Sequence, residues 1–159
     1  MATFTAIQTD SEDFALPWDG LQKVGVLKRE VDFSVAANYL ATTTIMPLFK
    51  IPAYVKVTEV GMRVITADTD ITTVHLGAYS RNETTLAITE IDADGFGVDM
   101  SLAATGYVAY DVDAVYNRQG TTGRGYVSIS DWYVTIYNAD ADTINGAKVE
   151  FFAIWEDLR

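Results

Sequence analysis

Beyond the first 20 residues, the chain consists of short runs of apolar and β-branched residues separated by clusters of Gly, Asp, Asn and Thr. The first run, "KVGVLKREVDF", alternates like a strand, with Val24, Val26 and Lys28 on one face. Val31 and Phe33 fall on the other face, so the apolar side changes along the run. Because a change of side indicates a bulge or a bend, we expect one in this strand.

Two further runs carry signals about their place in a sheet. The run "TTTIMPLFKI" contains Pro47, which has no backbone N–H and is therefore expected on an edge strand or at a strand end. The run "IPAYVKVTEVGMRVIT" places Val55 and Val57 on one face and then changes side near Thr58 and Glu59. This pattern predicts a long strand with an irregularity at that point.

The remaining runs complete an all-β pattern, in which aromatic and β-branched residues dominate. Only residues 31–41 and 99–104 are candidates for a helical turn. We therefore predict an all-β, antiparallel β-sandwich, jelly-roll-like, of about eight strands, which forms a single domain over residues 21–159. The other strand-like runs are "ITTVHLGAYS", "TTLAITEI", "TGYVAYDV", "GYVSISDWYVTIYN" and "AKVEFFAIW".

The first 20 residues follow neither a helical nor a strict two-residue period, yet they are rich in large apolar side chains. A free tail is not normally this apolar. We predict that residues 1–20 form an extended N-terminal arm that docks on its own sandwich or on a neighbouring molecule. The apolar residues of the arm are Phe4, Ile7, Phe14, Leu16 and Trp18.

The charge of the chain narrows its range of partners. Acidic residues number 22 against 11 basic ones, for a formal net charge of −11. Such a surface repels nucleic acid and anionic lipid, so we expect neither as a partner. No run is long and apolar enough for a membrane-spanning helix. The absence of Cys excludes disulfides and thiolate chemistry.

Residues with catalytic potential are few. His75 is the only histidine, and the chain has no G-x-S-x-G nucleophile motif. One His does not make a multi-His zinc site, so His75 is interpreted as a partly buried strand residue. The 22 acidic residues make carboxylate pairs inevitable by chance, and nothing singles out a pair for glycoside hydrolysis. We expect no enzymatic activity and no cofactor.

The loop "GTTGRG" (residues 120–125) resembles a phosphate-binding loop only superficially. A P-loop needs a Lys and a following helix, whereas this loop has no Lys and precedes the strand-like "YVSIS". We interpret it as a mobile hairpin loop, in which Arg118 and Arg124 are candidate contacts to an acidic neighbour.

Two acidic segments resemble calcium-binding loops. In "EIDADGFGVDM", Glu90, Asp92, Asp94 and Gly95 have the spacing of an EF-hand. Ser101 then stands at the twelfth position, where a bidentate carboxylate is required, and the segment "NADADTING" fails in the same way. Acidic residues and Gly are also common in turns, so we interpret "DADGF" as a turn between strands. Asp92 and Asp94 remain weak candidates for a calcium site.

The order of these motifs resembles that of small virion structural proteins of tailed bacteriophages, which are β-sandwich proteins that decorate heads or form appendages. An early "DFSVAANY" leads to "LFKIPAYVKVTEVGMRVITA" and then to "TTVHLGAYS". The "IDADGFGVDMSLA" segment and a final "NGAKVEFFAIW" follow. The resemblance covers residues 31–155 and rests on the ordered series, with Ile-Pro-Ala (51–53), "DADGF" and Gly-Ala-Lys-Val (146–149) as its strongest parts. It implies that Phe96 folds back onto the sandwich.

The resemblance further implies a non-enzymatic decoration or cement protein that binds the capsid surface and stabilises the head. Its partners would be the major capsid protein or other virion proteins, and further copies of itself, with a trimer favoured. Such a protein is located in the virion and assembles in the host cytoplasm. The expected latch consists of Phe4, Phe14, Leu16 and Trp18, with Arg118 and Arg124 as a second contact.

Two alternatives remain open from the sequence. The first is another position in the virion, as a neck, tail or fibre component. The second is a calcium-assisted carbohydrate-binding jelly roll, in which Trp132, Tyr133 and Tyr137 would stack on sugars.

Overall fold

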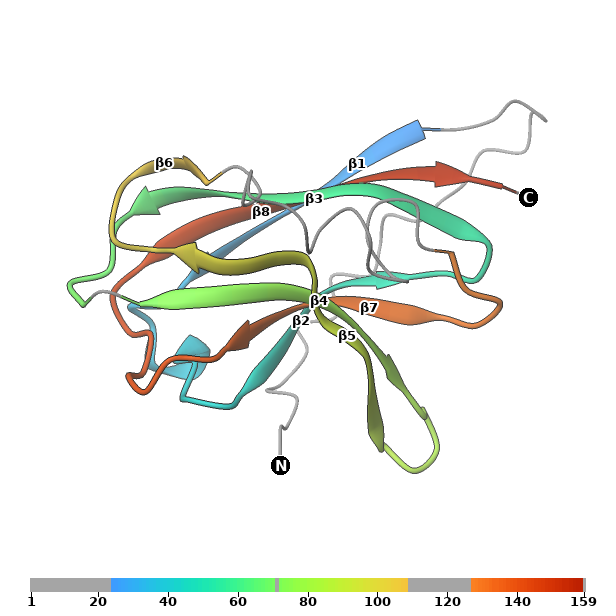
Figure 1. Ribbon diagram of the computed structural model, residues 1–159, viewed down its shortest axis with the longest axis horizontal. Coiled ribbons are helices and arrows are strands. Elements are labelled where there is room, and N and C mark those ends of the chain that lie inside the picture. Colours follow the sequence, from blue (N-terminus) through green and yellow to red (C-terminus); the bar gives the residue numbers. More distant parts are fainter. Residues whose placement is uncertain (1–23, 71, 109–126, 159) are drawn as a thin grey trace.

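Eight antiparallel strands and one 3₁₀ turn make up the part of the chain that the computed structural model describes, residues 24–70, 72–108 and 127–158. The strands form two four-stranded sheets, with orders β1-β8-β3-β6 and β2-β7-β4-β5, which lie face to face as two layers (Figure 1). We call them the β1 sheet and the β2 sheet. The prediction of an antiparallel β-sandwich of about eight strands is confirmed. The elements are β1 (Val24–Asp32), η1 (Ala36–Asn38), β2 (Ile45–Ile51), β3 (Val55–Thr66), β4 (Thr73–Arg81), β5 (Ile88–Ser101), β6 (Gly106–Val108), β7 (Trp132–Asn138) and β8 (Lys148–Asp157).

The strand pairing follows a nested order along the chain. Strand β4 pairs with β5, β3 with β6, β2 with β7 and β1 with β8, all antiparallel. This is the order expected if one long hairpin is rolled up into a sandwich. Every connection except β4–β5 passes from one sheet to the other. Both sheets are therefore built from early and late parts of the sequence.

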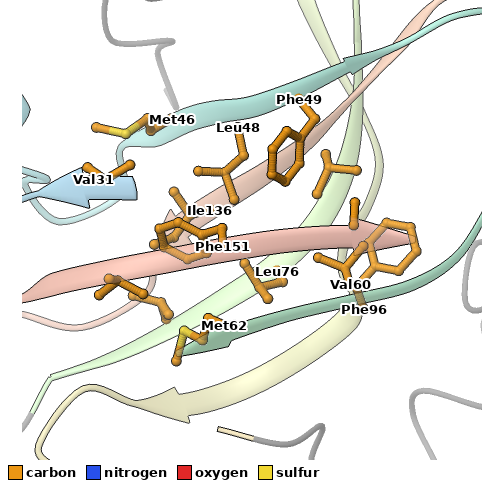
Figure 2. Close-up of a cluster of buried hydrophobic side chains, with 14 of the residues drawn as sticks. Val31, Met46, Leu48, Phe49, Val60, Met62, Leu76, Phe96, Ile136 and Phe151 are labelled. Carbon is orange, nitrogen blue, oxygen red and sulfur yellow. The ribbon is translucent and has the colours of Figure 1, made fainter. Parts of the chain in front are cut away.

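The hydrophobic core fills the space between the two sheets. Figure 2 shows side chains from both layers meeting there, including Leu76 and Ile136 of the β2 sheet and Met62 and Phe151 of the β1 sheet. These four side chains have no exposed surface. Complete burial of a side chain of this size contributes about 1.5–3 kcal/mol, so this core is the main source of stability for the sandwich.

Strand β1 differs from the sequence prediction. It pairs with β8 in an unbroken register from Val24↔Glu156 to Asp32↔Lys148, so the pairing contains no bulge. Val24 and Val26 are simply exposed, at 67% and 55% of their surface. The prediction was wrong because single apolar residues are common on protein surfaces, and their positions are a poor guide to which side faces the core.

Two other sequence predictions are confirmed. Pro47 lies on β2, which is an edge strand of its sheet, and the β2–β7 register shifts between Pro47 and Phe49. In β3 the register against β8 shifts between Val57 and Glu59, where the alternation changes side. A bulge lets residues before and after it face the same core.

Candidate interface on the β2 sheet

The outer face of the β2 sheet, which points away from the core, consists of three rows of side chains that cross β2, β7 and β4. Directly paired residues in a sheet point to the same side, so the register defines each row. The middle row is made of small residues, whereas the two flanking rows carry aromatic side chains. The rows are Ile45–Tyr137–His75, Pro47–Thr135–Gly77 and Lys50–Tyr133–Tyr79.

Most of this outer face is shielded from water. Ile45 and Thr135 have no exposed surface, and Tyr79 and Tyr133 each expose 4%. Ile45, Tyr79 and Tyr133 do not belong to the cluster of buried side chains between the sheets. A strand that is buried on both faces has apolar residues at successive positions, as "IMPLF" in β2 and "WYVTIY" in β7 do. The β2 sheet is thus a layer with two covered faces.

The outer face of the β1 sheet has the opposite character. It carries cross-strand ion pairs between Lys28 and Glu150 (3.8 Å) and between Lys148 and Glu30 (2.8 Å). Exposed ion pairs of this kind contribute little stability and are typical of a surface in contact with water. One outer face of the sandwich is therefore solvated, and the other is shielded from water.

Polar groups at one edge of the outer face have hydrogen-bond partners. The Tyr133 hydroxyl donates to Glu83 Oε1 at 2.6 Å, and Lys50 Nζ lies 3.6 Å from the same carboxylate oxygen. Burial, together with this hydrogen bond to a carboxylate, raises the pKa of Tyr133 to about 12. Burial, with the nearby negative charge of Glu90, also raises the pKa of Tyr79. Both shifts favour the neutral phenol, which is the form that burial favours.

The segment "DADGF" lies inside strand β5, so the expectation of a turn between strands was wrong. In the pairing of β4 with β5, Ala78 stands opposite Asp92 and Leu76 opposite Gly97. Gly77 alone therefore faces four residues, 93–96, which form a bulge with three extra residues. A turn and a bulge both favour Asp and Gly, which is why the composition did not separate them.

Phe96, the last residue of the bulge, is buried in the core. Phe96 is 1% exposed and stacks on Trp132, with ring centroids 6.0 Å apart and planes 17° from parallel. The prediction that Phe96 folds back onto the sandwich is confirmed. Trp132 has no exposed surface, so it offers no face to a sugar, and the carbohydrate-binding alternative loses the largest of its three aromatic residues.

Of the two weak metal candidates, Asp92 pairs with Ala78 at the edge of the bulge, and Asp94 lies within the bulge. The backbone N–H of Asp94 donates to Asp92 Oδ1 at 3.4 Å. Burial, with the neighbouring Asp92 carboxyl, raises the pKa of Asp94. Among the described residues, no group of three or more acidic or histidine side chains is arranged to hold a metal ion. A weak calcium site at Asp92 and Asp94 stays a prediction.

His75 occupies a corner of the outer face beside a second bulge, where it stands opposite Val98 and Asp99. His75 Nε2 lies 3.1 Å from Asp99 Oδ1, and the imidazole meets the Tyr137 ring edge-on at 5.9 Å. Only 17% of the His75 side chain is exposed, which confirms the interpretation as a partly buried strand residue.

The predicted contact residues of the arm, Phe4, Phe14, Leu16 and Trp18, and of the Gly-rich loop, Arg118 and Arg124, lie outside the described residues. The outer face itself was missed by the sequence reasoning. The signal was present in the β2 and β7 runs, whose apolar residues occupy successive rather than alternate positions.

No protein-family model and no curated protein sequence matches the chain. Solved structures that resemble it in fold include two from phage capsids. A chain from "Capsid of Ralstonia phage GP4" superposes with a TM-score of 0.67 over 100% of this chain and 99% of that one, at 15% sequence identity. A chain from "Cyanophage Pam1 capsid asymmetric unit" gives a TM-score of 0.50 over 96% of this chain and 98% of that one, also at 15% identity. At this level of identity, the likeness shows a shared fold.

Within the described part of the chain, no helix has the length and apolar character needed to span a membrane.

Proposed function

We propose that this protein is a non-enzymatic structural component of a tailed-phage virion, and specifically a head decoration or cement protein. The observation that carries the proposal is the fold shared with a chain of the Ralstonia phage GP4 capsid structure, because it extends over the full length of both chains. The nested pairing of eight strands supports a jelly roll, which is an architecture used by capsid proteins.

The outer face of the β1 sheet carries paired, solvated charges, which suits the side of a coat protein that faces water. The net charge of −11 suits the water-facing side, because like charges keep coated particles apart. In this role, the protein acts through surface complementarity and uses no catalytic residue.

The proposed partners are the major capsid protein or other virion proteins, and further copies of the chain, with a trimer favoured. Within the proposed interface, Phe4, Phe14, Leu16 and Trp18 form the latch, and Arg118 and Arg124 supply a second contact to an acidic surface. The location that follows is the capsid surface, after assembly in the host cytoplasm.

The first test is binding to capsids that lack the protein. The full chain and a chain without residues 1–20 are mixed with such capsids, and the bound protein is measured after sedimentation. We expect the full chain to sediment with the capsids and the shortened chain to stay in the supernatant. Equal binding by both chains would show that the arm is not the latch.

Copy number in purified virions separates a decoration protein from a neck, tail or fibre component. We expect quantitative mass spectrometry to give on the order of hundreds of copies per virion, because a coat protein follows the symmetry of the whole head. A result of about a dozen copies would place the protein in the neck or tail.

A further inference from the structure

The outer face of the β2 sheet is covered by something other than the opposite sheet. The described strands form two layers, and the β1 sheet lies against the inner side of the β2 sheet only (Figure 1). On the outer side, the β5 bulge lies over Gly77, at the end of the middle row that is farthest from β2. Even so, Ile45 and Thr135, in the first two rows of the outer face, have no exposed surface, and Tyr133 in the third row exposes only 4%. Leaving these side chains in water would cost about 25 cal/mol for each Å² of apolar surface, so a third layer over this face is favoured.

We propose that the third layer is the N-terminal segment of the same chain, residues 1–23, with Phe14, Leu16 and Trp18 packed on the outer face. The proposal concerns the isolated protein and does not depend on the position of the protein in a virion. If the proposed function is also correct, the latch is divided between two surfaces. Phe14, Leu16 and Trp18 then anchor the arm on its own sheet, and Phe4, near the start of the arm, contacts the capsid.

The place where the segment joins the sandwich favours this arrangement. The segment leads directly into Val24, the first residue of β1, and β1 lies beside the β2 edge of the other sheet. Arg29 joins these two edges, since its Nη1 donates to the carbonyl oxygens of Pro47 at 2.7 Å and Leu48 at 3.2 Å. A chain that leaves β1 at this edge needs only to turn around β2 to reach the outer face.

The segment also leaves β1 at the end of the sandwich from which the outer face of the β2 sheet can be reached. Val24 pairs with Glu156, whose neighbour Asp157 pairs with Val55 at the start of β3. A short link joins Val55 to Ile51 at the end of β2, so all these residues lie at one end of the sandwich. The row Lys50–Tyr133–Tyr79 is the part of the outer face closest to that end.

The length of the segment is sufficient. Fully extended, 23 residues reach about 75 Å. The path around the edge crosses the gap between the sheets, about 10 Å, and then three strands spaced about 4.8 Å apart. The segment can therefore cross the whole outer face with residues to spare.

The residue pattern of the segment matches the face. Over the whole segment there is no strict alternation, but in "FALPW" the large side chains of Phe14, Leu16 and Trp18 recur at every second position. In an extended chain, these three point to the same side. Pro17 lacks a donor, which suits a segment that packs by side chains better than one that joins a sheet by hydrogen bonds. Aromatic and apolar side chains also match the tyrosines of the flanking rows.

A single cysteine in the middle of the face tests the proposal, because the natural chain has no Cys. Thr135→Cys places a thiol at a fully buried position of the outer face, and Ala153→Cys places one at a fully buried position in the core. The rate of reaction with a water-soluble disulfide reagent is measured in the full chain and in a chain without residues 1–20. We expect the deletion to raise the rate at Thr135→Cys at least about tenfold, or about 1.4 kcal/mol, and to leave Ala153→Cys slow.

Because the deletion can also loosen the domain, the measurement is repeated in the full-length chain with Leu16→Ser and Trp18→Ser. This pair is expected to raise the rate at Thr135→Cys, and the polar control pair Thr3→Ser and Thr5→Ser is expected to leave it unchanged. An unchanged slow rate at Thr135→Cys in both arm variants would overturn the proposal, since another segment would then cover the face. A fast rate in the unaltered arm would overturn it as well.

Dilution of the Thr135→Cys protein shows whether the segment that protects the thiol belongs to the same chain or to a second copy. Protection that is independent of protein concentration supports the proposal, because a contact within one chain does not dissociate on dilution. Protection that is lost on dilution would assign the cover to a second copy and overturn the arrangement proposed here. None of these measurements uses capsids, so their outcome is independent of the test of capsid binding.

Discussion

At Gly77 of β4, the backbone of the β5 bulge lies close to the position that a side chain would take. A Cβ at this position would lie 2.2 Å from the carbonyl oxygen of Ala93 and 2.5 Å from that of Asp92. Because both contacts are to backbone, Gly77→Ala has to displace the β5 bulge. We expect the substitution to lower the free energy of unfolding by about 1–3 kcal/mol, as other overpacked sites do, in urea denaturation followed by circular dichroism.

Gly61→Ala is the matched control. Its Cβ would lie 2.4 Å from Cζ of Phe152, which is nearly as close, but that atom is the far end of a side chain that can rotate away. We expect Gly61→Ala to cost clearly less than Gly77→Ala. Equal losses in the two variants would contradict the conclusion that the bulge is held rigidly over Gly77.

The hydrogen bond between Tyr133 and Glu83 predicts a dependence of stability on pH. This bond lowers the pKa of the Glu83 carboxyl, with smaller contributions from the charges of Lys50 and Arg81. A lowered pKa means that the stabilisation is present above the pKa of the unfolded chain and is lost as the pH falls through the folded value. Glu83 is half exposed, so solvent screening keeps the contribution of the bond small, at about 1 kcal/mol.

Tyr133→Phe removes this bond. We expect the unfolding free energy of the variant to fall below that of the natural chain at about pH 7, and the difference to narrow toward about pH 3 as Glu83 is protonated. Tyr39→Phe, at an exposed position, serves as the control and is expected to give no such trend. A difference for Tyr133→Phe that stays constant over this range would show that the charge of Glu83 is not involved.

At the scale of the elements, the alternation of apolar and polar residues predicted strand features correctly where a strand has one covered face. Strand β3 is such a case, and its irregularity at Thr58 and Glu59 follows from the change of side. In strand β1, the expected change of side rested on Val24 and Val26, and both of these residues are exposed. The pairing in a sheet, which fixes the side of each residue, depends on a distant strand that local alternation does not reveal.

The β5 bulge and the outer face of the β2 sheet could not be predicted from the local sequence pattern, for the same physical reason. "DADGF" has the composition of a turn, and only the pairing of β4 with β5 shows that the chain continues as a strand. The outer face combines β2, β7 and β4, which are far apart in sequence. Its residues become neighbours through long-range pairing, so the sequence supplied only the apolar runs and not the surface they form.

At the scale of the whole molecule, the two sheets depend on each other. One continuous cluster of buried side chains spans both layers, and every connection except β4–β5 passes between the sheets. Neither sheet can therefore unfold without exposing the core face of the other. We expect the two-layer sandwich to unfold in a single cooperative transition, as small single domains commonly do.

Tryptophan fluorescence checks this expectation sheet by sheet, because Trp132 lies in the β2 sheet and Trp155 in the β1 sheet. In a Trp18→Phe background, Trp132→Phe leaves Trp155 as the only reporter, and Trp155→Phe leaves Trp132. In each variant we expect the denaturation midpoint from fluorescence to coincide with the midpoint from far-ultraviolet circular dichroism. Comparing the two probes within one variant removes the effect of the substitution on stability. If Trp155 responds at a lower denaturant concentration than the circular dichroism of the same protein, the β1 sheet opens on its own and the two layers are not one cooperative unit.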